Sequence, residues 1–437
     1  ILIFYSLLQK MDLYHTPPKQ LDTFIFLHLQ PDQSFQVQVG ETIDKICRFL
    51  MQPCFSDHNT IKIIKTVKGG STGKGTALKN RSDADLVVFI SQFRSFQDQK
   101  QNRGDILTMI KEMLIKIRQS IAFEIIMTEP KTTPSGFFTS PRSLNFHFQS
   151  REGSDSIEVD VLPAFDALGQ QTRSCPSAQV YLDLINANGV RAEFSPCFTE
   201  LQRDFVKHRP AKLKGLIRLV KHWYNEYVRP YKTQLRRGEF LPPKYALELL
   251  IIYAWESVGG GENFNTAAGF CTIMELIIKY RQLWIFWTDN YNFDSLGSFL
   301  TKKLAEPRPM ILDPADPTGN VAGNARWDFL AKEAQCCLQQ GCLMGVIPWD
   351  VEPVKSIQVS VLPIDISCSW QCFSMSPFLP IRHIKERFGN LPGIPMSNCY
   401  LEWNNQTLNE NWTLFDYKMF HDVTICLKEQ AGWCILM

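Results

Sequence analysis

The chain has 437 residues and a mass of 50.3 kDa. At about 150 residues per domain, it is long enough for about two or three domains. Hydrophobic residues make up 45% and charged residues 21% of the chain, which excludes a disordered tail, a collagen-like fibre and a small disulfide scaffold. The formal net charge is only +2, which also excludes an overall basic coat for nucleic acid, so any nucleic-acid surface must be a local cluster.

The cysteines and the first residues bear on the compartment. The 13 cysteines are odd in number and scattered, which favours a reducing, cytoplasmic location, with a nuclear pool left open. No apolar run of the sequence reaches the about 20 residues that span a bilayer. Residues 1–10 are apolar but lack an initiator Met and a cleavage site, so we interpret them as an upstream, non-native segment rather than an anchor.

The predicted elements of the first half mix helices with strands. Apolar residues recur at helical spacing over 20–55 and 105–123. Strands are predicted at 61–67, which is rich in β-branched residues, and at 85–90, which is a continuous apolar run. Alternating apolar and polar residues predict two more strands at 144–149 and 157–162.

The second half changes character twice. From about residue 195 helices dominate, and the clearest lie at 210–227, 243–257 and 326–340. The proline-rich stretch 307–317 is predicted as a loop. After residue 355, short strands at 357–362, 399–403 and 422–427 surround one helix at 381–388, which predicts a small β-grasp domain.

Glycine, hydroxyl and lysine residues gather in a predicted loop at 69–76, directly after the first strand. It is not a Walker A loop, because Lys68 replaces the first glycine of that pattern and Gly75 follows Lys74. Its backbone N–H groups suit phosphate oxygens. A flexible hairpin turn is the alternative that this segment alone leaves open.

Three aspartates follow this loop. Asp83 and Asp85 lie two residues apart, so they share one face of a strand. Asp160 interrupts a later apolar strand, where a lone buried charge would be expensive. Grouped carboxylates repel unless a cation lies between them, and Mg²⁺ prefers such oxygen ligands. A capped turn with solvated acids is the alternative for the first pair, and Glu158 competes with Asp160.

The glycine-serine loop, the Asp-x-Asp strand and the later strand aspartate form a nucleotidyltransferase pattern. Two Mg²⁺ ions held by three carboxylates would activate a ribose hydroxyl and neutralise the departing pyrophosphate. The predicted fold class is α+β, with a nucleotidyltransferase (polymerase-beta-like) α/β lobe. The expected divisions are N-terminal helices and α/β lobe at 11–195, helical lobe at 196–350, β-grasp domain at 355–430 and tail at 431–437.

Several longer phrases match one family. They lie at 67–76, 81–89, 159–169, 199–205, 219–224, 245–250 and 312–318. From about residue 11 to 349 the chain resembles the 2′-5′-oligoadenylate synthetases. The resemblance implies an interferon-linked antiviral enzyme of innate immunity, in which double-stranded RNA closes the cleft. ATP is then polymerised into 2′-5′ oligoadenylates that activate a latent ribonuclease.

The resemblance also implies roles for individual residues. It makes Asp83, Asp85 and Asp160 the catalytic Mg²⁺ ligands, with Asp160 closest to a base for the 2′-hydroxyl. The implied ATP-binding positions are Ser71, Lys74, Arg218, Lys221, Lys244 and Tyr245. The implied RNA-binding positions are Arg203, Lys207 and Lys212, which suit phosphates across an A-form minor groove.

Three of these positions, and the neighbouring position 211, carry an alternative or a departure from the family. From the residues alone, Arg218 and Lys221 form a solvated basic flank of a helix. Lys244 stands where the family usually has Gln, which bears on donor contacts or base preference. Ala211 stands where Thr is common, so one hydroxyl contact to RNA is expected to be lost.

The C-terminal residues resemble the ubiquitin-like tail of the oligoadenylate-synthetase-like proteins. Those proteins usually carry two such domains, and this sequence shows one. It lacks a terminal Gly-Gly, so we expect the domain to bind a protein partner rather than to be conjugated to substrates. The alternative is a folded remnant without a function of its own. Residues 434–437 fit a CaaX box, which predicts prenylation of Cys434 and weak membrane association. The alternative is that this match arose by chance.

Two rival functions remain open. One is a catalytically silent RNA sensor that signals through its ubiquitin-like domain, although the intact aspartates and loop favour an active enzyme. The other is a cyclic-dinucleotide synthase, which the long phrase matches disfavour. Cys336, Cys337 and Cys342 form only a weak metal pattern and are interpreted as ordinary thiols.

Overall fold

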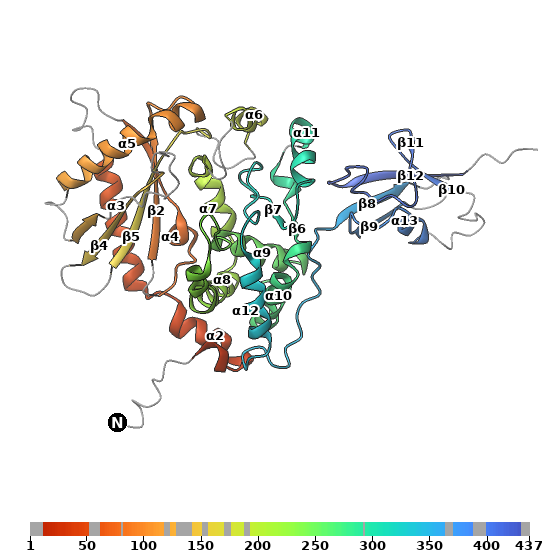
Figure 1. Ribbon diagram of the computed structural model, residues 1–437, viewed down its shortest axis with the longest axis horizontal. Helices are drawn as coiled ribbons and strands as arrows, with labels where there is room; N and C mark the ends of the chain where they lie inside the picture. Colours follow the sequence, from red (N-terminus) through yellow and green to blue (C-terminus); the bar gives the residue numbers. More distant parts are fainter. Residues whose placement is uncertain are drawn as a thin grey trace, which may run out of the picture.

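The computed structural model contains two sheets of five strands that are separated by a helical lobe, and Figure 1 shows these parts in a row along the long axis. It describes residues 12–51, 62–79, 82–117, 123–127, 142–150, 156–169, 176–187, 193–291, 293–362, 370–387 and 399–429. The predicted segment 1–10 and Cys434 lie outside the described residues.

The first sheet has the strand order β1-β2-β5-β4-β3. Its strands are β1 (Ile63–Lys68), β2 (Ser82–Ile90), β3 (Phe123–Met127), β4 (Leu144–Ser150) and β5 (Ser156–Ala164). The neighbours β2 and β5 are parallel, and the other pairs are antiparallel. Both faces of this central pair are covered, which accounts for the continuous apolar run in β2.

Alternate residues of β2 belong to two different cores. Leu86, Val88 and Ile90 pack with α3 (Gln33–Leu50) and α5 (Phe96–Ile117). Val87 and Phe89 belong to a second core that includes residues of the helical lobe. Since side chains alternate along a strand, Asp85 lies on the same face as Val87 and Phe89, toward the helical lobe.

The predicted helix at 20–55 is interrupted. A 3-10 turn (Pro18–Gln20), α2 (Leu21–Phe24) and a π turn (Ile25–Leu29) end before Pro31, and α3 starts after it. Gln30 is extended, because a proline disfavours the helical conformation of the residue before it. Helix α5 starts at Phe96 rather than Asp105, with the Ser95 hydroxyl accepting from the backbone N–H of Asp98.

The helical lobe follows the predicted pattern. Helix α6 (Ala178–Asn186) precedes it, and its own helices are α7 (Thr199–Lys207), α8 (Ala211–Trp223), α9 (Lys244–Ser257), α10 (Thr266–Ile278), α11 (Phe293–Leu304) and α12 (Trp327–Leu338). Residues 246–255 of α9 are all buried, so this helix forms the centre of the lobe. Two short parallel strands, β6 (Trp284–Ile285) and β7 (Met310–Ile311), lie at its edge.

The C-terminal sheet has the order β11-β10-β12-β8-β9. Its elements are β8 (Ile357–Leu362), β9 (Gln371–Met375), α13 (Arg382–Arg387), β10 (Cys399–Trp403), β11 (Gln406–Thr407) and β12 (Val423–Glu429). The first and last strands, β8 and β12, are parallel neighbours in the middle, and α13 contributes buried Ile384 to the core beneath the sheet. The α+β fold class is confirmed, and this strand order is the one expected of the predicted β-grasp domain.

An aromatic contact joins the C-terminal domain to the helical lobe. The Trp284 ring lies 5.3 Å from that of Phe378, 6.0 Å from Phe415 and 5.5 Å from Phe420, between ring centroids. The backbone of residues 353–355 pairs with Trp284 through hydrogen bonds of 3.0 and 2.9 Å. The linker is therefore fixed to the lobe as an added strand. None of the described helices is long and apolar enough to cross a bilayer.

Candidate active site

Two of the predicted aspartates lie opposite each other on the central strands. In the parallel pairing of β2 and β5, Asp85 is the partner of Asp160 and Asp83 is the partner of Glu158. Asp85 and Asp160 are half-buried. The side chains of Asp83 and Glu158 lie outside the described part, so their strand positions alone are given. Because Asp85 and Asp160 are register partners, their side chains lie on one face of the sheet.

A short helix, α4 (Gly70–Lys74), replaces the loop predicted beside these aspartates. The Gly69 N–H donates to the Asp85 carbonyl at 2.7 Å, which holds the start of α4 against β2. Gly70 has φ +59°, and a Cβ there would lie 2.9 Å from Oδ2 of Asp85. A Cβ at Gly73 would lie 2.3 Å from the Lys68 carbonyl oxygen. The glycines therefore permit a close approach between α4 and the carboxylate, and they do not form a flexible turn.

Lys74 and Lys221 share one buried carboxylate. Oε2 of Glu248 accepts from Lys74 at 2.9 Å, and Oε1 accepts from Lys221 at 2.9 Å and from the Thr76 hydroxyl at 3.2 Å. Burial acts to raise the pKa of Glu248, but the two ammonium groups outweigh it and lower this pKa to about 2. Sequence reasoning missed Glu248, although a lone acid inside the apolar helix α9 was a signal for it.

Arg218 is also buried, so the interpretation of a solvated basic flank is wrong. Arg218 is 9% exposed and Lys221 is 3% exposed. The guanidinium of Arg218 donates to the Ala77 carbonyl at 3.0 Å and to the Gly75 carbonyl at 2.7 Å. The segment after α4 covers this flank of α8, and helical periodicity cannot reveal a cover that comes from a distant part of the chain.

Tyr245 lies under Lys74 at the start of α9. The Lys74 ammonium is 4.0 Å from the ring centroid of Tyr245, and the Tyr245 hydroxyl donates to Asp313 at 3.0 Å. Burial and the neighbouring Asp316 carboxylate raise the pKa of Asp313 to about 6. Lys244, one residue before Tyr245, is half-buried.

The predicted RNA residues lie along α7 and the start of α8. Arg203 pairs with Asp204 at 2.7 Å, Lys207 is exposed, and Lys212 lies 3.6 Å from a carboxylate oxygen of Asp22.

Sequence reasoning missed Lys214. Its ammonium donates to the Lys207 carbonyl at 2.5 Å, and a Cβ at Gly75 would lie 3.7 Å from it. Burial, with help from the charges of Arg218 and Lys207, lowers the pKa of Lys214. A basic row of Lys207, Lys214 and Arg218 thus runs from the surface to the segment after α4.

A cavity of about 280 Å³ opens beside Asp85. Its lining includes Arg103, Arg142 and Glu193. Arg103 and Glu193 form a buried ion pair of 2.6 Å, and Arg142 lies 3.5 Å from the other Glu193 oxygen. This arginine-rich wall was also missed, because its members are far apart in the sequence. We call this space the Asp85 cavity.

Among the described side chains, no group of three or more His, Cys, Asp or Glu residues is arranged to hold a metal ion. That set does not include the Asp83 side chain. Cys336 is exposed, whereas Cys337 and Cys342 are buried as free thiols.

Two family models match the chain. A nucleotidyltransferase domain matches residues 53–131, and domain 2, the C-terminus, of 2′-5′-oligoadenylate synthetase 1 matches residues 174–360. The first of these covers α4 and β2, and the second covers α7, α8 and α9.

Curated relatives match over most of the chain. The chain is 48% identical to 2′-5′-oligoadenylate synthase 3 of Rattus norvegicus, over 78% of this chain and only 30% of the relative. It is 44% identical to 2′-5′-oligoadenylate synthase 1A of the same species, over 83% of this chain and 99% of the relative. It is 41% identical to 2′-5′-oligoadenylate synthase-like protein 2 of Mus musculus, over 96% of this chain and 84% of the relative.

Among solved structures, one similar chain comes from a complex described as E. coli MS115-1 CdnC:HORMA-deltaN. It has 20% sequence identity and a TM-score of 0.49, and the match covers 74% of this chain and 90% of that chain.

Proposed function

Because the chain belongs to the 2′-5′-oligoadenylate synthase family, we propose that it polymerises ATP into 2′-5′-linked oligoadenylates when double-stranded RNA binds. In each step the 2′-oxygen of an acceptor adenylate forms a bond to the α-phosphorus of a donor ATP. The bond from that phosphorus to the β-phosphate bridge breaks, and pyrophosphate leaves. The product would serve innate antiviral defence by activating a latent ribonuclease.

The observation that carries this proposal is the pairing of Asp85 with Asp160 beside α4. These carboxylates come from adjacent parallel strands, and Gly70 lets the backbone of α4 approach one of them. A carboxylate on β5 suits the removal of a proton from an acceptor hydroxyl. We assign that role to Asp160.

Mg²⁺ fits this donor set. Asp85 and Asp160 are paired on adjacent strands, and Asp83 stands two positions before Asp85 on β2. Carboxylate oxygens are the ligands that hard divalent cations prefer. We propose that these three residues hold two Mg²⁺ ions, which when bound would supply charge neutralisation at the transferring phosphate.

The donor ATP would be held by residues around α4. We assign its triphosphate to Ser71, Lys74, Arg218 and Lys221, and its base to the ring of Tyr245, with Lys244 beside it. In the structure, Lys74 lies over that ring and pairs with Glu248, so nucleotide binding requires Lys74 to move away from Tyr245.

RNA would act on this arrangement through α7 and the start of α8. We propose that Arg203, Lys207 and Lys212 contact RNA phosphates on one edge of the helical lobe. Lys214 links Lys207 to the segment that Arg218 holds, so a shift of α7 and α8 reaches α4 through direct contacts.

The remaining assignments concern the rest of the chain. We propose the division into lobes at 11–195 and 196–350 and a ubiquitin-like domain at 355–430 that binds a protein partner. A cytoplasmic location, with weak membrane association through prenylated Cys434, belongs to the same proposal.

The test is to incubate the full chain with ATP and Mg²⁺, with and without double-stranded RNA, and to resolve the products by length. The proposal expects RNA-dependent oligomers that resist a 3′-5′-specific nuclease and that vanish in Asp83→Ala and Asp160→Ala. RNA binding without any oligomer would contradict it. That result would favour the silent sensor that signals through its C-terminal domain, and Lys244 would be the first residue to examine.

A further inference from the structure

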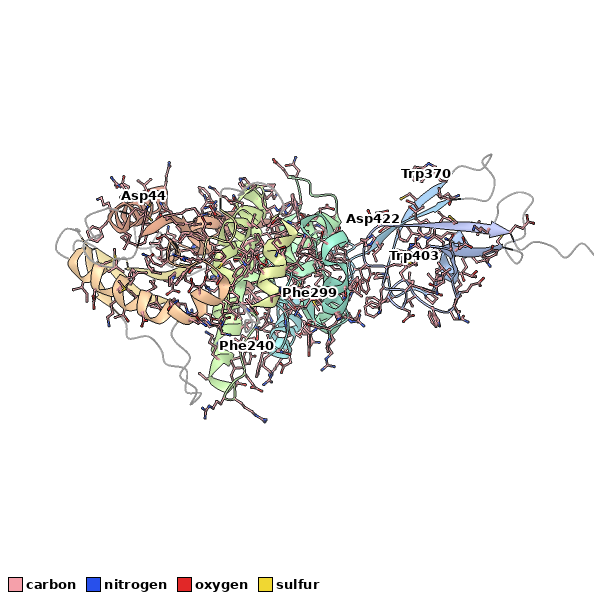
Figure 2. The ribbon with its side chains drawn as sticks, turned by 90° about the horizontal axis from the view of Figure 1, so that it is seen from above. Asp44, Phe240, Phe299, Trp370, Trp403 and Asp422 are labelled. Atoms are coloured by element: carbon pink, nitrogen blue, oxygen red, sulfur yellow. The ribbon has the colours of Figure 1, made fainter. Side chains whose placement is uncertain are left out.

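A second cavity, larger than the Asp85 cavity, lies between α6 and α11. Its volume is about 650 Å³, which is within the range of pockets that hold small ligands. Its walls include Leu184 of α6, Phe299 and Lys302 of α11, and residues 306–309 of the following loop. Phe299 is labelled in Figure 2 on the helical lobe. We call this space the α6–α11 cavity.

The two cavities meet at one residue. Glu193 lines both the α6–α11 cavity and the Asp85 cavity. On the Asp85 side, Glu193 is held by Arg103 at 2.6 Å and approached by Arg142 at 3.5 Å. The buried ion pair of Glu193 and Arg103 therefore lies at the boundary between two neighbouring cavities.

Beside its ion pairs, the α6–α11 cavity has two cations, Lys302 and Arg308, and one carboxylate, Asp316. Glu193 is neutralised by Arg103, and Lys303 pairs with Glu306 at 3.0 Å. The buried Asp316 carboxylate accepts two hydrogen bonds from Thr318.

Lys302 and Arg308 are both exposed and line the cavity, and neither has an ion pair within the parts of the chain that the structure describes. A lysine and an arginine without counter-ions, next to the half-buried ring of Phe299, suit a phosphorylated nucleotide.

Chain growth creates such a ligand. The proposed reaction adds each adenylate at the 2′-hydroxyl end, so the 5′-triphosphate of the acceptor moves away from Asp160 as the oligomer lengthens. We propose that the α6–α11 cavity binds the 5′-triphosphate end of the growing oligoadenylate, with Lys302 and Arg308 on the phosphates and Phe299 against a base. This inference rests on the proposed function, and it assigns a product-length site to that enzyme.

The C-terminal domain holds one member of this site. The Arg308 guanidinium lies 4.5 Å from the ring centroid of Phe378, which belongs to the aromatic contact between domain and lobe. Phe378 is thus a positioning residue for Arg308. The domain would support the synthesis of longer products through this stacking contact.

The first experiment compares product lengths for the full chain and for the double variant Lys302→Glu/Arg308→Glu, at equal ATP consumption. Dimer formation needs only ATP as acceptor, so it should stay within about twofold of wild type. Products of three or more adenylates should fall at least about tenfold relative to dimer, because two charge-assisted contacts are replaced by repulsion.

Matched controls separate this effect from a general charge effect. Arg281 lies over the Tyr280 ring and Lys332 over the Tyr231 ring, so each is a surface cation stacked on an aromatic residue away from the cavity. The double variant Arg281→Glu/Lys332→Glu should keep the wild-type product distribution. Phe378→Leu should shorten the products, and Phe378→Tyr, which keeps the ring, should restore them. An unchanged distribution in Lys302→Glu/Arg308→Glu, or an equal loss at all lengths, would overturn the inference.

A binding measurement keeps this test apart from the test of catalysis. Two chemically synthesised 2′-5′ triadenylates, with and without a 5′-triphosphate, are titrated onto the full chain without ATP. The wild type should prefer the triphosphorylated trimer by at least about tenfold, and Lys302→Glu/Arg308→Glu should lose that preference. A preference that survives this double variant would refute the site. Absence of any oligomer synthesis by the wild type would refute the proposed function, and the binding result would still report on the cavity.

Discussion

Gly70 shows how the absence of a side chain at one position permits the geometry of the site. A Cβ at Gly70 would lie 2.9 Å from the Asp85 carboxylate, whereas a Cβ at Gly169 would meet nothing within 4 Å. Both glycines have positive φ, +59° and +56°. Backbone strain is therefore the same at the two positions, and only Gly70 adds a clash with a carboxylate.

We expect Gly70→Ala and Gly169→Ala to differ in activity more than in stability. Each should lower the free energy of unfolding by about 1–2 kcal/mol. Gly70→Ala should also lower oligoadenylate synthesis by at least about 100-fold, because it displaces Asp85. Urea unfolding and an ATP-turnover assay measure the two effects. Equal activity of the two variants would show that the approach of α4 to Asp85 is not needed.

Glu248 links stability to pH. Its pKa is lowered to about 2 in the folded chain, because Lys221 and Lys74 outweigh the effect of burial. The stabilisation is therefore complete above the ordinary carboxyl pKa of about 4.3, and it is lost as the pH falls toward about 2. At neutral pH, the lowered pKa of Glu248 corresponds to a contribution on the order of 3 kcal/mol to the free energy of unfolding.

Glu248→Gln should therefore destabilise the chain at pH 7, and the difference from wild type should shrink as the pH falls from about 4.3 toward about 2. Asp44→Asn is the control, because Asp44, which is labelled in Figure 2, is an exposed residue that pairs with Lys68 at the surface. Its effect should stay below about 1 kcal/mol. Urea midpoints across pH measure both, and a pH-independent difference for Glu248→Gln would contradict the assignment.

Among single residues, sequence reasoning singled out the aspartates and several basic residues near them, and it missed the buried acids Glu248 and Glu193. Asp85 and Asp160 stand out because charges interrupt apolar strands, and the strand pairing brings them together. Glu248 and Glu193 were missed, because their partners Lys74, Lys221 and Arg103 lie far away in the chain. A distant ion pair leaves no periodic signal.

At the scale of elements, α8 anchors the segment that follows α4. Arg218 reaches two carbonyl oxygens of that segment, on Gly75 and Ala77, with one planar guanidinium. A lysine carries all its donors on one nitrogen, so Lys at position 218 lacks the planar fork with which Arg218 spans the two carbonyls.

Arg218→Lys should loosen the segment and slow the reaction. Hydrogen exchange of residues 75–79 should become faster, and kcat/KM for ATP should fall about tenfold or more. Arg326→Lys is the control, because Arg326 pairs with Glu239 and Asp328 rather than with this segment. Unchanged exchange in Arg218→Lys would argue that the segment is held by other contacts.

Periodicity predicted many of the elements, although α6, α10, α11, β3 and β9 were not among them. Two predicted elements differ from the structure for local reasons. The helix at 20–55 breaks at Pro31, whose ring disfavours the helical conformation of Gln30. The loop at 69–76 contains a helical turn instead, because glycines that look flexible are fixed by close contacts with Lys68 and Asp85. Propensity alone cannot distinguish these two uses of glycine.

At the scale of the whole molecule, the C-terminal domain is bound to the helical lobe by buried aromatic residues, and Figure 1 shows the domain at one end of the chain's long axis. Phe420 is 2% exposed and Trp284 is 1% exposed. This interface could not be read from the sequence, because Trp284 and Phe420 carry no pairing signal and lie in different domains.

Phe420→Ala should lower the free energy of unfolding by about 3 kcal/mol or more, as for other buried phenylalanines. Phe240→Ala is the control, since Phe240 is 38% exposed, and it should cost less than about 1 kcal/mol. Calorimetry should show the domain and the helical lobe unfolding together in the wild type and separating in Phe420→Ala. Two independent transitions in the wild type would contradict a fixed interface.

The central claim is that the paired carboxylates of β2 and β5 make this chain an RNA-dependent synthase. The most direct measurement is oligoadenylate synthesis with double-stranded RNA, ATP and Mg²⁺ by wild type, Asp160→Asn and Asp183→Asn, with RNA binding measured in parallel. Asp183 is exposed on α6 and serves as the matched control. The account predicts synthesis by wild type and Asp183→Asn, and none by Asp160→Asn, with RNA bound equally by all three. Synthesis by Asp160→Asn at the wild-type rate would contradict it.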